Sequence, residues 1–334
     1  MNKADIEMEN ERLKGSWDCF PAEHLAKYLS LGEQDQRINA HSILTRALLA
    51  DTLWPGKFDA LIDEELRFGL VMTWLLQQLK SGVDRFELLR ELDAAAPCHR
   101  IPELLQETAA WLHRDDCPVT DYMTDALMFT EPDLPAWSLF EPALNTFAGL
   151  WSRQLANMLA ERVSVLEIAC GSGNDYAAIL DFGLAAHISY AGFDISWKNI
   201  RNARDRFPGV DFFEASILDS GLPDDSFDFI FVHDLLGHLS PDALEVALAE
   251  IMRIARKEAW LHCFNVADIG NHEVYPFQAY YRNRLSIWQV KASLEKLGAS
   301  VEFVSITDMF YNKFRFRQEY TEFSGSFIVK KSAT

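Results

Sequence analysis

Three side chains that can transfer protons or bind a metal lie at the ends of two apolar runs. His233 and Asp234 directly follow SFDFIFV at 226–232, and His262 lies near the end of EAWLHCF at 258–264. Imidazole and carboxylate groups can act as general bases, and together they can bind a divalent metal through nitrogen and oxygen. We therefore predict that these three residues are catalytic, either as the ligands of a metal or through metal-free base catalysis.

A glycine-containing turn is the second candidate site. Gly171 and Gly173 follow the apolar run at 163–169 and precede a helical pattern, so the backbone N–H groups can approach a ligand closely. Asp194 ends the next apolar run, where its carboxylate can accept hydrogen bonds from ribose hydroxyls. A nicotinamide-binding fingerprint would have a third glycine where Tyr176 stands, which disfavours a dehydrogenase.

The elements that must position these residues alternate between short apolar runs and helical patterns. The runs that read as strands are 163–169, 187–193, 210–215, 226–232 and 258–264. Helical patterns at 196–206 and 241–256 separate some of them, which predicts a parallel sheet whose ligands bind beyond the carboxyl ends of the strands. A helix at 286–297 and strands at 301–306 and 324–331, joined by a long loop, predict an antiparallel hairpin at the edge of the sheet.

The first half of the chain reads as helical. Segments 34–51 and 59–80 place apolar residues at helical spacing. Shorter helical pieces are expected at 84–94, 101–113 and 137–160. We predict a helical domain over 1–150, serving as a cap or a dimer surface, and a cofactor-binding domain over 151–334. Aromatic residues that can line a pocket under the cap are Trp17, Phe20, Tyr28, Trp137 and Phe140.

Four successive motifs resemble those of one enzyme family. They are LEIACGSGND (166–175), GFDIS (192–196), FFEASILDSGLPDDSFDFIFV (212–232) and HDLLGHL (233–239). Their order and spacing resemble those of class I S-adenosylmethionine-dependent methyltransferases. The resemblance implies an α/β fold with a Rossmann-like, doubly wound, mostly parallel seven-stranded sheet, an antiparallel C-terminal edge hairpin and a preceding all-helical domain.

The resemblance also implies roles for individual residues in binding S-adenosylmethionine. Glu167 and the turn of Gly171 and Gly173 would hold the methionine part, Asp194 would bind the ribose, and Ile195 would flank the adenine. Many members of the family have an acidic residue after the third strand to bind the adenine amino group. This chain has Ser216 followed by Ile217 at that place, so these two residues are the predicted adenine contacts, with Asp219 close by.

The methyl acceptor is expected beyond the fourth and fifth strands, where the candidate bases lie. One hypothesis is C-methylation of a 2-oxo acid, resembling the metal-assisted 2-oxo-acid methyltransferases, in which a metal held by His233, Asp234 and His262 makes the C3 proton more acidic. The alternative is metal-independent O- or N-methylation with His233 as general base. A third is a non-catalytic cofactor sensor or scaffold. His238 lies in a turn that is common in the family, which favours a structural role.

Two basic and aromatic loops are candidates for substrate contacts. Segment 265–284 contains Tyr281, Arg282 and Arg284, which are predicted to bind the substrate. Segment 309–320 adds Lys313, Arg315 and Arg317. A guanidinium group in either loop would suit a carboxylate-bearing substrate.

The composition excludes several classes of partner. The chain has 334 residues, 49% of them hydrophobic, and a formal net charge of −19, which disfavours binding to nucleic acid phosphates. Its apolar runs are shorter than the ~20 residues that a membrane-spanning helix needs. The five cysteines contain no CxxC pair, so neither a disulfide framework nor a cysteine zinc site fits. We expect a cytoplasmic enzyme with a small-molecule substrate, no nucleic acid or membrane partner, and homodimerisation as one role for the helical part.

Overall fold

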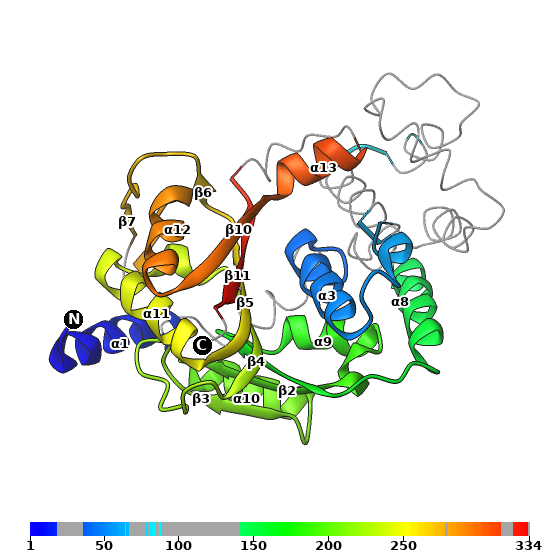
Figure 1. Ribbon diagram of the computed structural model, residues 1–334, viewed down its shortest axis with the longest axis horizontal. Helices are drawn as coiled ribbons and strands as arrows, with labels where there is room; N and C mark the ends of the chain where they lie inside the picture. Colours follow the sequence, from blue (N-terminus) through cyan, green and yellow to red (C-terminus); the bar gives the residue numbers. More distant parts are fainter. Residues whose placement is uncertain are drawn as a thin grey trace.

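The computed structural model describes residues 1–18, 36–63, 65–66, 78, 81–84, 87, 141–277, 280–314 and 323–332. In this part of the chain a seven-stranded sheet has the order β10-β11-β5-β4-β1-β2-β3 (Figure 1). Its strands are β1 (Val163–Ile168), β2 (Ile188–Asp194), β3 (Asp211–Glu214), β4 (Phe227–His233), β5 (Ala255–Cys263), β10 (Ala299–Ser305) and β11 (Gly325–Lys331).

The first five of these strands pair in parallel, and β11 pairs antiparallel with both β5 and β10. The predicted Rossmann-like sheet with an antiparallel C-terminal hairpin at its edge is therefore confirmed. The boundaries are close to those predicted, except that β5 begins at Ala255 rather than at 258.

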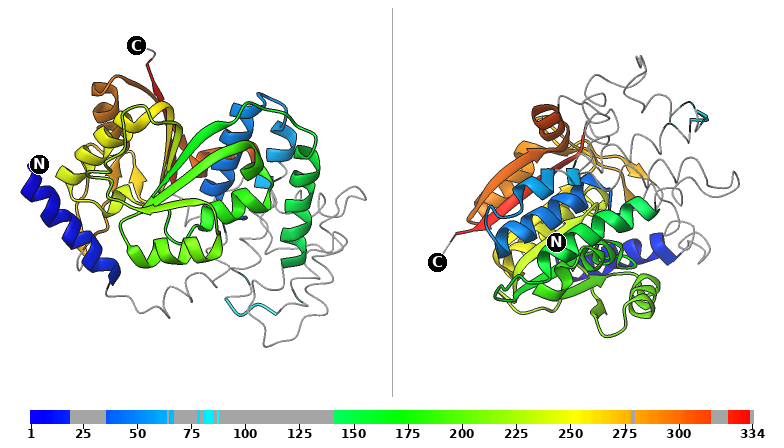
Figure 2. Two further views of the ribbon diagram at one scale, coloured as in Figure 1. Left: turned by 90° about the horizontal axis from the view of Figure 1, so that it is seen from below. Right: turned by 90° about the vertical axis from the view of Figure 1, so that its right-hand side faces the viewer.

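Helices cover both faces of the sheet (Figure 2). On one face lie α3 (Ala40–Leu53), α8 (Glu141–Leu155) and α9 (Asn174–Asp181), packed in one apolar cluster with side chains of the strands. On the other face lie α11 (Pro241–Ile254) and α12 (Ile287–Lys296). Helix α10 (Trp197–Arg206) contacts β2 and β3. Side chains alternate along a strand, so successive residues of β1 and β4 enter the two clusters in turn.

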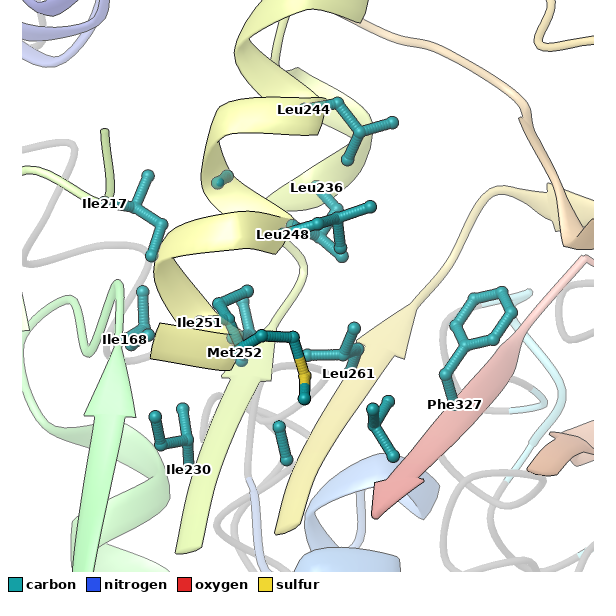
Figure 3. Close-up of a cluster of buried hydrophobic side chains, with 14 of the residues drawn as sticks. Ile168, Ile217, Ile230, Leu236, Leu244, Leu248, Ile251, Met252, Leu261 and Phe327 are labelled. Atoms are coloured by element: carbon teal, nitrogen blue, oxygen red, sulfur yellow. The ribbon is translucent and has the colours of Figure 1, made fainter. Parts of the chain in front are cut away.

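The packing of α11 shows why its sequence is helical. Its apolar residues recur at three- and four-residue spacing, which places one apolar stripe against the sheet. Leu244, Leu248 and Ile251 lie on this stripe, over strand residues that include Ile230 and Leu261 (Figure 3). Ser240 caps the helix by accepting a hydrogen bond from the N–H of Ala243 at 3.3 Å.

The structure corrects some boundaries and adds elements that the sequence pattern did not predict. The helix expected at 34–51 is α3, and the helix expected at 137–160 is α8, which crosses the predicted domain boundary at 150. Helix α13 (Ile306–Phe314) occupies part of the predicted loop between the last two strands. Helix α1 (Lys3–Asp18) was not predicted. The division into domains 1–150 and 151–334 stays a prediction.

Short elements follow β5 in the segment where substrate contacts were predicted. Strands β6 (Val266–Ala267) and β9 (Leu285–Ser286) pair in parallel, and β7 (Pro276–Phe277) pairs antiparallel with β8 (Tyr280–Tyr281). The helices expected at 84–94 and 101–113 fall outside the described residues, apart from scattered positions in the first. The side chains of Trp17, Phe20, Tyr28, Trp137 and Phe140 also fall outside them.

Within the described part of the chain, no helix combines the length and the apolar character that crossing a membrane requires.

A buried ion pair holds α3 in place. Arg46 and Glu65 are both inaccessible to solvent, and Arg46 Nε donates a hydrogen bond to Glu65 Oε1 at 2.9 Å. The guanidinium also donates to the carbonyl oxygens of Gln36 and Arg37, and it lies over the ring of Phe182 at 4.3 Å. These contacts connect α3 to the residues that precede it and to Phe182, which follows α9.

Replacing Arg46 by Met is expected to lower the free energy of unfolding by about 3–5 kcal/mol, because the carboxylate of Glu65 then lies buried without its partner. Urea unfolding followed by circular dichroism measures the change. Replacing both residues, Arg46→Met with Glu65→Leu, is expected to restore most of the loss. Asp205→Ala is the control, since it removes only the exposed pair between Asp205 and Arg201. A full-sized loss in the double variant would contradict this account.

Candidate active site

The glycine turn at the end of β1 has the backbone geometry of a ligand cradle. Ala169, Gly171 and Gly173 all have positive φ values, of 59°, 52° and 78°. A Cβ atom built on Gly171 would meet nothing within 4 Å, whereas one on Gly173 would lie 3.0 Å from the ring of Phe207. Gly171 therefore leaves its backbone open to a ligand, and Gly173 allows close packing against the residues behind the turn.

Helix α10 fixes the position of this turn. Asn202 Nδ2 donates a hydrogen bond to Ser172 Oγ at 3.3 Å, and Arg206 donates to Asn174 Oδ1 at 2.8 Å and to the carbonyl oxygen of Ser172. Side chains of α10 therefore hold the turn, while the space beside Gly171 stays open.

Asp194, at the end of β2, connects the glycine turn to the start of α10. Its Oδ2 accepts from the N–H of Gly171 at 3.0 Å, and its Oδ1 accepts from the N–H of Ser196 at 2.7 Å and from Asn199 Nδ2 at 3.4 Å. Burial raises the pKa of Asp194, which is 6% exposed, although the backbone hydrogen bonds oppose the shift. A carboxylate has about four acceptor positions, so one is left for a ribose hydroxyl.

Glu167 lies beneath the same turn and is almost fully buried, at 2% exposure. Burial raises the pKa of Glu167 well above its ordinary value, and the neighbouring carboxylates Asp175 and Asp194 raise it further. The hydroxyl of Tyr190, on β2, donates a hydrogen bond to Glu167 Oε2. The sequence analysis did not identify Tyr190 as part of the site.

The donor and acceptor set around the turn fits a cofactor that carries positive charge and ribose hydroxyls. Three carboxyl groups, of Glu167, Asp175 and Asp194, are buried here, and the charges of Asp175 and Asp194 add to the raised pKa of Glu167. Asp175 Oδ1 is buried and has no hydrogen-bond partner among the described residues, so it can accept from an ammonium group of a ligand. Gly171 supplies the open backbone beside these acceptors.

The predicted adenine end of the site is bordered by α1. Ser216 Oγ donates to Asn10 Oδ1 and accepts from the N–H of Leu218 at 3.0 Å. Lys14 Nζ lies 3.1 Å from Glu214 Oε1. Ile217 is buried in the cluster under α11 (Figure 3), and Ile195 packs against that cluster. The adenine contacts of Ser216 and Ile217 stay predictions, and the hydroxyl of Ser216 already has a partner on α1.

The strongest candidate for acid–base chemistry is a buried His–Asp pair. His233 is the last residue of β4, and its Nδ1 lies 3.0 Å from Oδ2 of Asp175, in the first turn of α9. Burial lowers the pKa of His233, but the charge and hydrogen bond of Asp175 outweigh it and the net shift is upward. Burial raises the pKa of Asp175, but His233 and a hydrogen bond from Ser42 outweigh it and the net shift is downward.

His262 lies beside His233, and both of its ring nitrogens have hydrogen-bond partners within the fold. The two residues are register partners in β4 and β5, so both side chains lie on the same face of the sheet. His262 Nε2 lies 2.7 Å from Thr45 Oγ1, and its Nδ1 lies 2.7 Å from Ser326 Oγ. Burial and the charge of His233 lower the pKa of His262 to about 3, so it is neutral with both nitrogens bonded.

Asp234 does not converge with the two histidines. It has a left-handed backbone conformation, with φ of 53°, and a side chain that is 49% exposed. Its Oδ2 lies 3.8 Å from Nε2 of His238, whose Nδ1 donates to the carbonyl oxygen of Tyr281 at 2.9 Å. The catalytic and metal-binding roles of His233, Asp234 and His262 stay predictions, and in this structure the carboxylate of Asp234 lies toward His238 rather than toward the other two residues. Among the residues that the structure describes, no group of three His, Cys, Asp or Glu side chains is placed to hold a metal ion.

Helix α3 brings a third histidine into this region, His41, which the sequence analysis missed. The ring centroid of His41 lies 5.5 Å from that of His233 and 5.4 Å from that of His262. His41 is separated from both by far more than a hundred residues, so no local spacing could have identified it. The sequence analysis also did not select Asp175 as a site residue. Asp175 is the last residue of the motif LEIACGSGND, and its position in the first turn of a helix after a glycine turn could have indicated a site residue.

The predicted substrate residues lie between β8 and β9. The guanidinium of Arg12, on α1, lies over the ring of Tyr281 at 4.9 Å. Arg284 Nη1 lies 3.1 Å from Glu273 Oε2, and its guanidinium lies over the ring of Phe323 at 4.5 Å. The side chain of Arg282 is exposed. Arg284 is therefore already paired, which reduces its suitability for a substrate carboxylate. The side chains of Lys313, Arg315 and Arg317 lie outside the described residues.

Comparisons with known proteins give one family match and several similar solved structures. Residues 165–258 match the family model described as a methyltransferase domain. Similar solved structures include the cyclase SpnF, with 17% identity over 58% of this chain and 83% of that chain and a TM-score of 0.41. Another is a SAM-dependent methyltransferase from Methanosarcina mazei, with 16% identity over 54% and 98% of the two chains and a TM-score of 0.41. A search of curated protein sequences found no match.

A glycine turn after β1 and an acidic residue at the end of β2, on one edge of a doubly wound sheet, define a protein that binds a nucleotide-containing cofactor. With the family match over residues 165–258, they identify this part of the chain as a class I S-adenosylmethionine-dependent methyltransferase domain. The protein is an enzyme, and its cofactor is S-adenosylmethionine.

Replacing Asp194 by Ala is expected to weaken binding of S-adenosylhomocysteine at least tenfold, because the variant loses the acceptor for the ribose and the bonds that hold Gly171 and Ser196. Calorimetric titration measures the dissociation constant. Asp205→Ala, an exposed position on α10, is the matched control and should bind as the wild type does. Unchanged affinity in Asp194→Ala would mean that this carboxylate is not part of the cofactor site.

Proposed function

We propose that this enzyme transfers the methyl group to an oxygen or nitrogen atom of a small molecule, without a metal, and that His233 is the general base. The observation that carries the proposal is the 3.0 Å contact between His233 Nδ1 and Asp175 Oδ2 at the carboxyl end of β4. The family match supports methyl transfer but not the identity of the acceptor.

S-adenosylmethionine supplies a methyl group that is already activated by the positive sulfonium to which it is bonded. The chain therefore has to hold the nucleophile in line with that methyl group and remove its proton when it arrives protonated. Asp175 holds Nδ1 of His233, which leaves Nε2 as the nitrogen that takes the proton. The carboxylate then stabilises the imidazolium that forms, as in other acid–base pairs of this kind.

The surroundings of the pair favour this role. His233 and Asp175 side chains are 8% and 7% exposed, so water competes little for the proton. The rings of His233 and Phe264 are nearly parallel, with centroids 5.6 Å apart, so Phe264 helps to hold the imidazole in position. His262 remains neutral and bonded, so it does not share the proton.

Metal-assisted C-methylation of a 2-oxo acid is less well supported. It needs ligands that converge, whereas His262 has both nitrogens bonded to Thr45 and Ser326 and Asp234 points toward His238. The net charge of −19 supports a small-molecule acceptor rather than a nucleic acid. We retain the cytoplasmic location and the homodimer as predictions from the sequence, the second of which light scattering would measure.

Incubation with a metabolite extract and S-adenosylmethionine labelled in the methyl group would test the proposed reaction. We expect labelled product that persists after complete chelation of divalent metals. His233→Phe keeps an aromatic ring without a basic nitrogen and should lower kcat at least a hundredfold, because general-base catalysis contributes about 10²–10⁴-fold. Its affinity for S-adenosylhomocysteine should be unchanged.

His187→Gln is the matched control for His233→Phe, since His187 precedes β2 at the amino end of the strands, against Trp54. Activity that disappears on chelation, or a His233→Phe variant as active as the wild type, would contradict the metal-free mechanism.

The pH dependence of the reaction should reveal the His–Asp pair. The pKa of His233 lies above its ordinary value of 6.5, so kcat/KM of the wild type should fall as the pH is lowered through that raised pKa. Asp175→Asn removes the charge that raises it, so the acidic limb of the profile should move to lower pH. His41 and His262 have lowered pKa values and do not titrate in this range. An acidic limb at the same pH in both proteins would rule out His233 as the group observed.

A further inference from the structure

His41 presents an unexplained pair of polar atoms in the middle of the candidate active site. Its side chain is 1% exposed, and neither Nδ1 nor Nε2 has a hydrogen-bond partner in the part of the chain that the structure describes. Buried polar groups in folded proteins are nearly always hydrogen-bonded, and an exception needs an explanation such as a catalytic role or a bound water or ligand. The two nitrogens therefore mark a place where a polar ligand fits.

The neighbouring histidine shows that the lack of partners is specific to His41. Thr45, one helical turn after His41 on α3, reaches His262 Nε2 at 2.7 Å, and Ser326 reaches His262 Nδ1 at the same distance. The described residues thus provide both partners for the imidazole of His262 and none for that of His41, although the two ring centroids are only 5.4 Å apart.

The position of His41 relates it to the proposed base. Its ring is perpendicular to that of His233, with 5.5 Å between centroids, and it meets the ring of Phe264 at 4.6 Å. A molecule whose nucleophilic atom contacts His233 would therefore have an adjacent atom within reach of His41. Helix α3 also packs on α9, which carries Asp175 (Figure 1).

The charges near His41 restrict what this molecule can be. Burial lowers the pKa of His41 well below its ordinary value, and His262 and His233 lower it further, so the ring is neutral with one donor and one acceptor nitrogen. Arg46 is the cation on the same helix, but its five N–H groups are used by Glu65, Gln36, Arg37 and Ser42. A substrate carboxylate would find no available donor on this guanidinium.

We propose that His41 binds the methyl acceptor, and that the acceptor is an uncharged molecule carrying a second hydroxyl or amine next to its nucleophilic group. The second group bonds one nitrogen of His41, either by donating to the acceptor nitrogen or by accepting from the donor nitrogen, while the nucleophile faces His233. The proposal rests on the proposed role of His233, but it adds a substrate class and a residue outside the matched family region at 165–258.

Two small probes that differ by one hydroxyl test this directly. Catechol and phenol are titrated into the full-length protein saturated with S-adenosylhomocysteine, and binding is followed by NMR of the imidazole nitrogens. We expect the wild type to bind catechol about tenfold more tightly than phenol, as one added buried hydrogen-bonded group allows. His41→Phe should bind the two probes equally, with unchanged affinity for phenol and for S-adenosylhomocysteine.

Two further variants separate binding from folding. His41→Gln retains one donor and one acceptor and should recover part of the preference for catechol, and His187→Gln should behave as the wild type. Equal affinity of the wild type for both probes, no binding of either, or a preference that survives His41→Phe would overturn the proposal. So would a parallel loss of both probes and of cofactor in His41→Phe, because His41 would then act only through the fold.

Failure of this proposal can be distinguished from failure of the proposed function. Loss of activity in His233→Phe with no preference for catechol would leave the general base in place and remove only the role of His41. Wild-type activity in His233→Phe together with an intact, His41-dependent preference would contradict the role of His233 as general base and leave the binding role of His41 in place.

Discussion

The parallel pairing of β1, β2, β4 and β5 is the constraint on which the candidate active site depends. Parallel strands end at the same edge, so the glycine turn, Asp194, His233 and the end of β5 meet there although they are distributed over a hundred residues. Because side chains alternate along each strand, Glu167, His233 and His262 then lie on the face covered by α3 and α9. A shift of register by one residue would turn all three toward α11.

Burial of charge is the second feature of this edge. Glu167, Asp175 and Asp194 lie within one small region, and only Asp175 has a histidine partner that lowers its pKa. Concentrating carboxyl groups in this way costs stability in the absence of a ligand, because burial and mutual repulsion both disfavour the charged forms. The same arrangement suits a cofactor that brings a sulfonium and an ammonium group. The buried carboxyl groups are therefore explained by cofactor binding, since they do not stabilise the fold.

Two described helices from the N-terminal half of the chain, α1 and α3, contribute residues around the candidate site. Helix α3 supplies His41 and Ser42, and it shares an apolar cluster with strand residues such as Phe231 and Trp260. Helix α1 borders the opposite end, through Asn10 and Lys14. The fully buried pair of Arg46 and Glu65 holds α3 against the layer above the sheet. Substrate selection and fold stability are therefore combined in one helix.

Much of this protein could be predicted from its sequence. Alternating apolar runs and helical patterns predicted the strands of the sheet and their parallel direction, because local periodicity reflects which side chains are buried. The glycine turn and Asp194 were identifiable because a close backbone approach and a strand-end carboxylate are local features. The motif series also gave the enzyme class, since those features recur at a fixed spacing along the chain.

Only the tertiary structure decided how the candidate catalytic residues are used. The sequence predicted that His233, Asp234 and His262 act together, with His233 as the base if no metal is bound. In the fold, His233 pairs with Asp175, Asp234 lies toward His238, and both nitrogens of His262 are bonded. The site residues His41 and Asp175 come from elements that only packing brings next to β4. Hydrogen bonding and burial depend on neighbours in space, which a one-dimensional pattern of residue types does not contain.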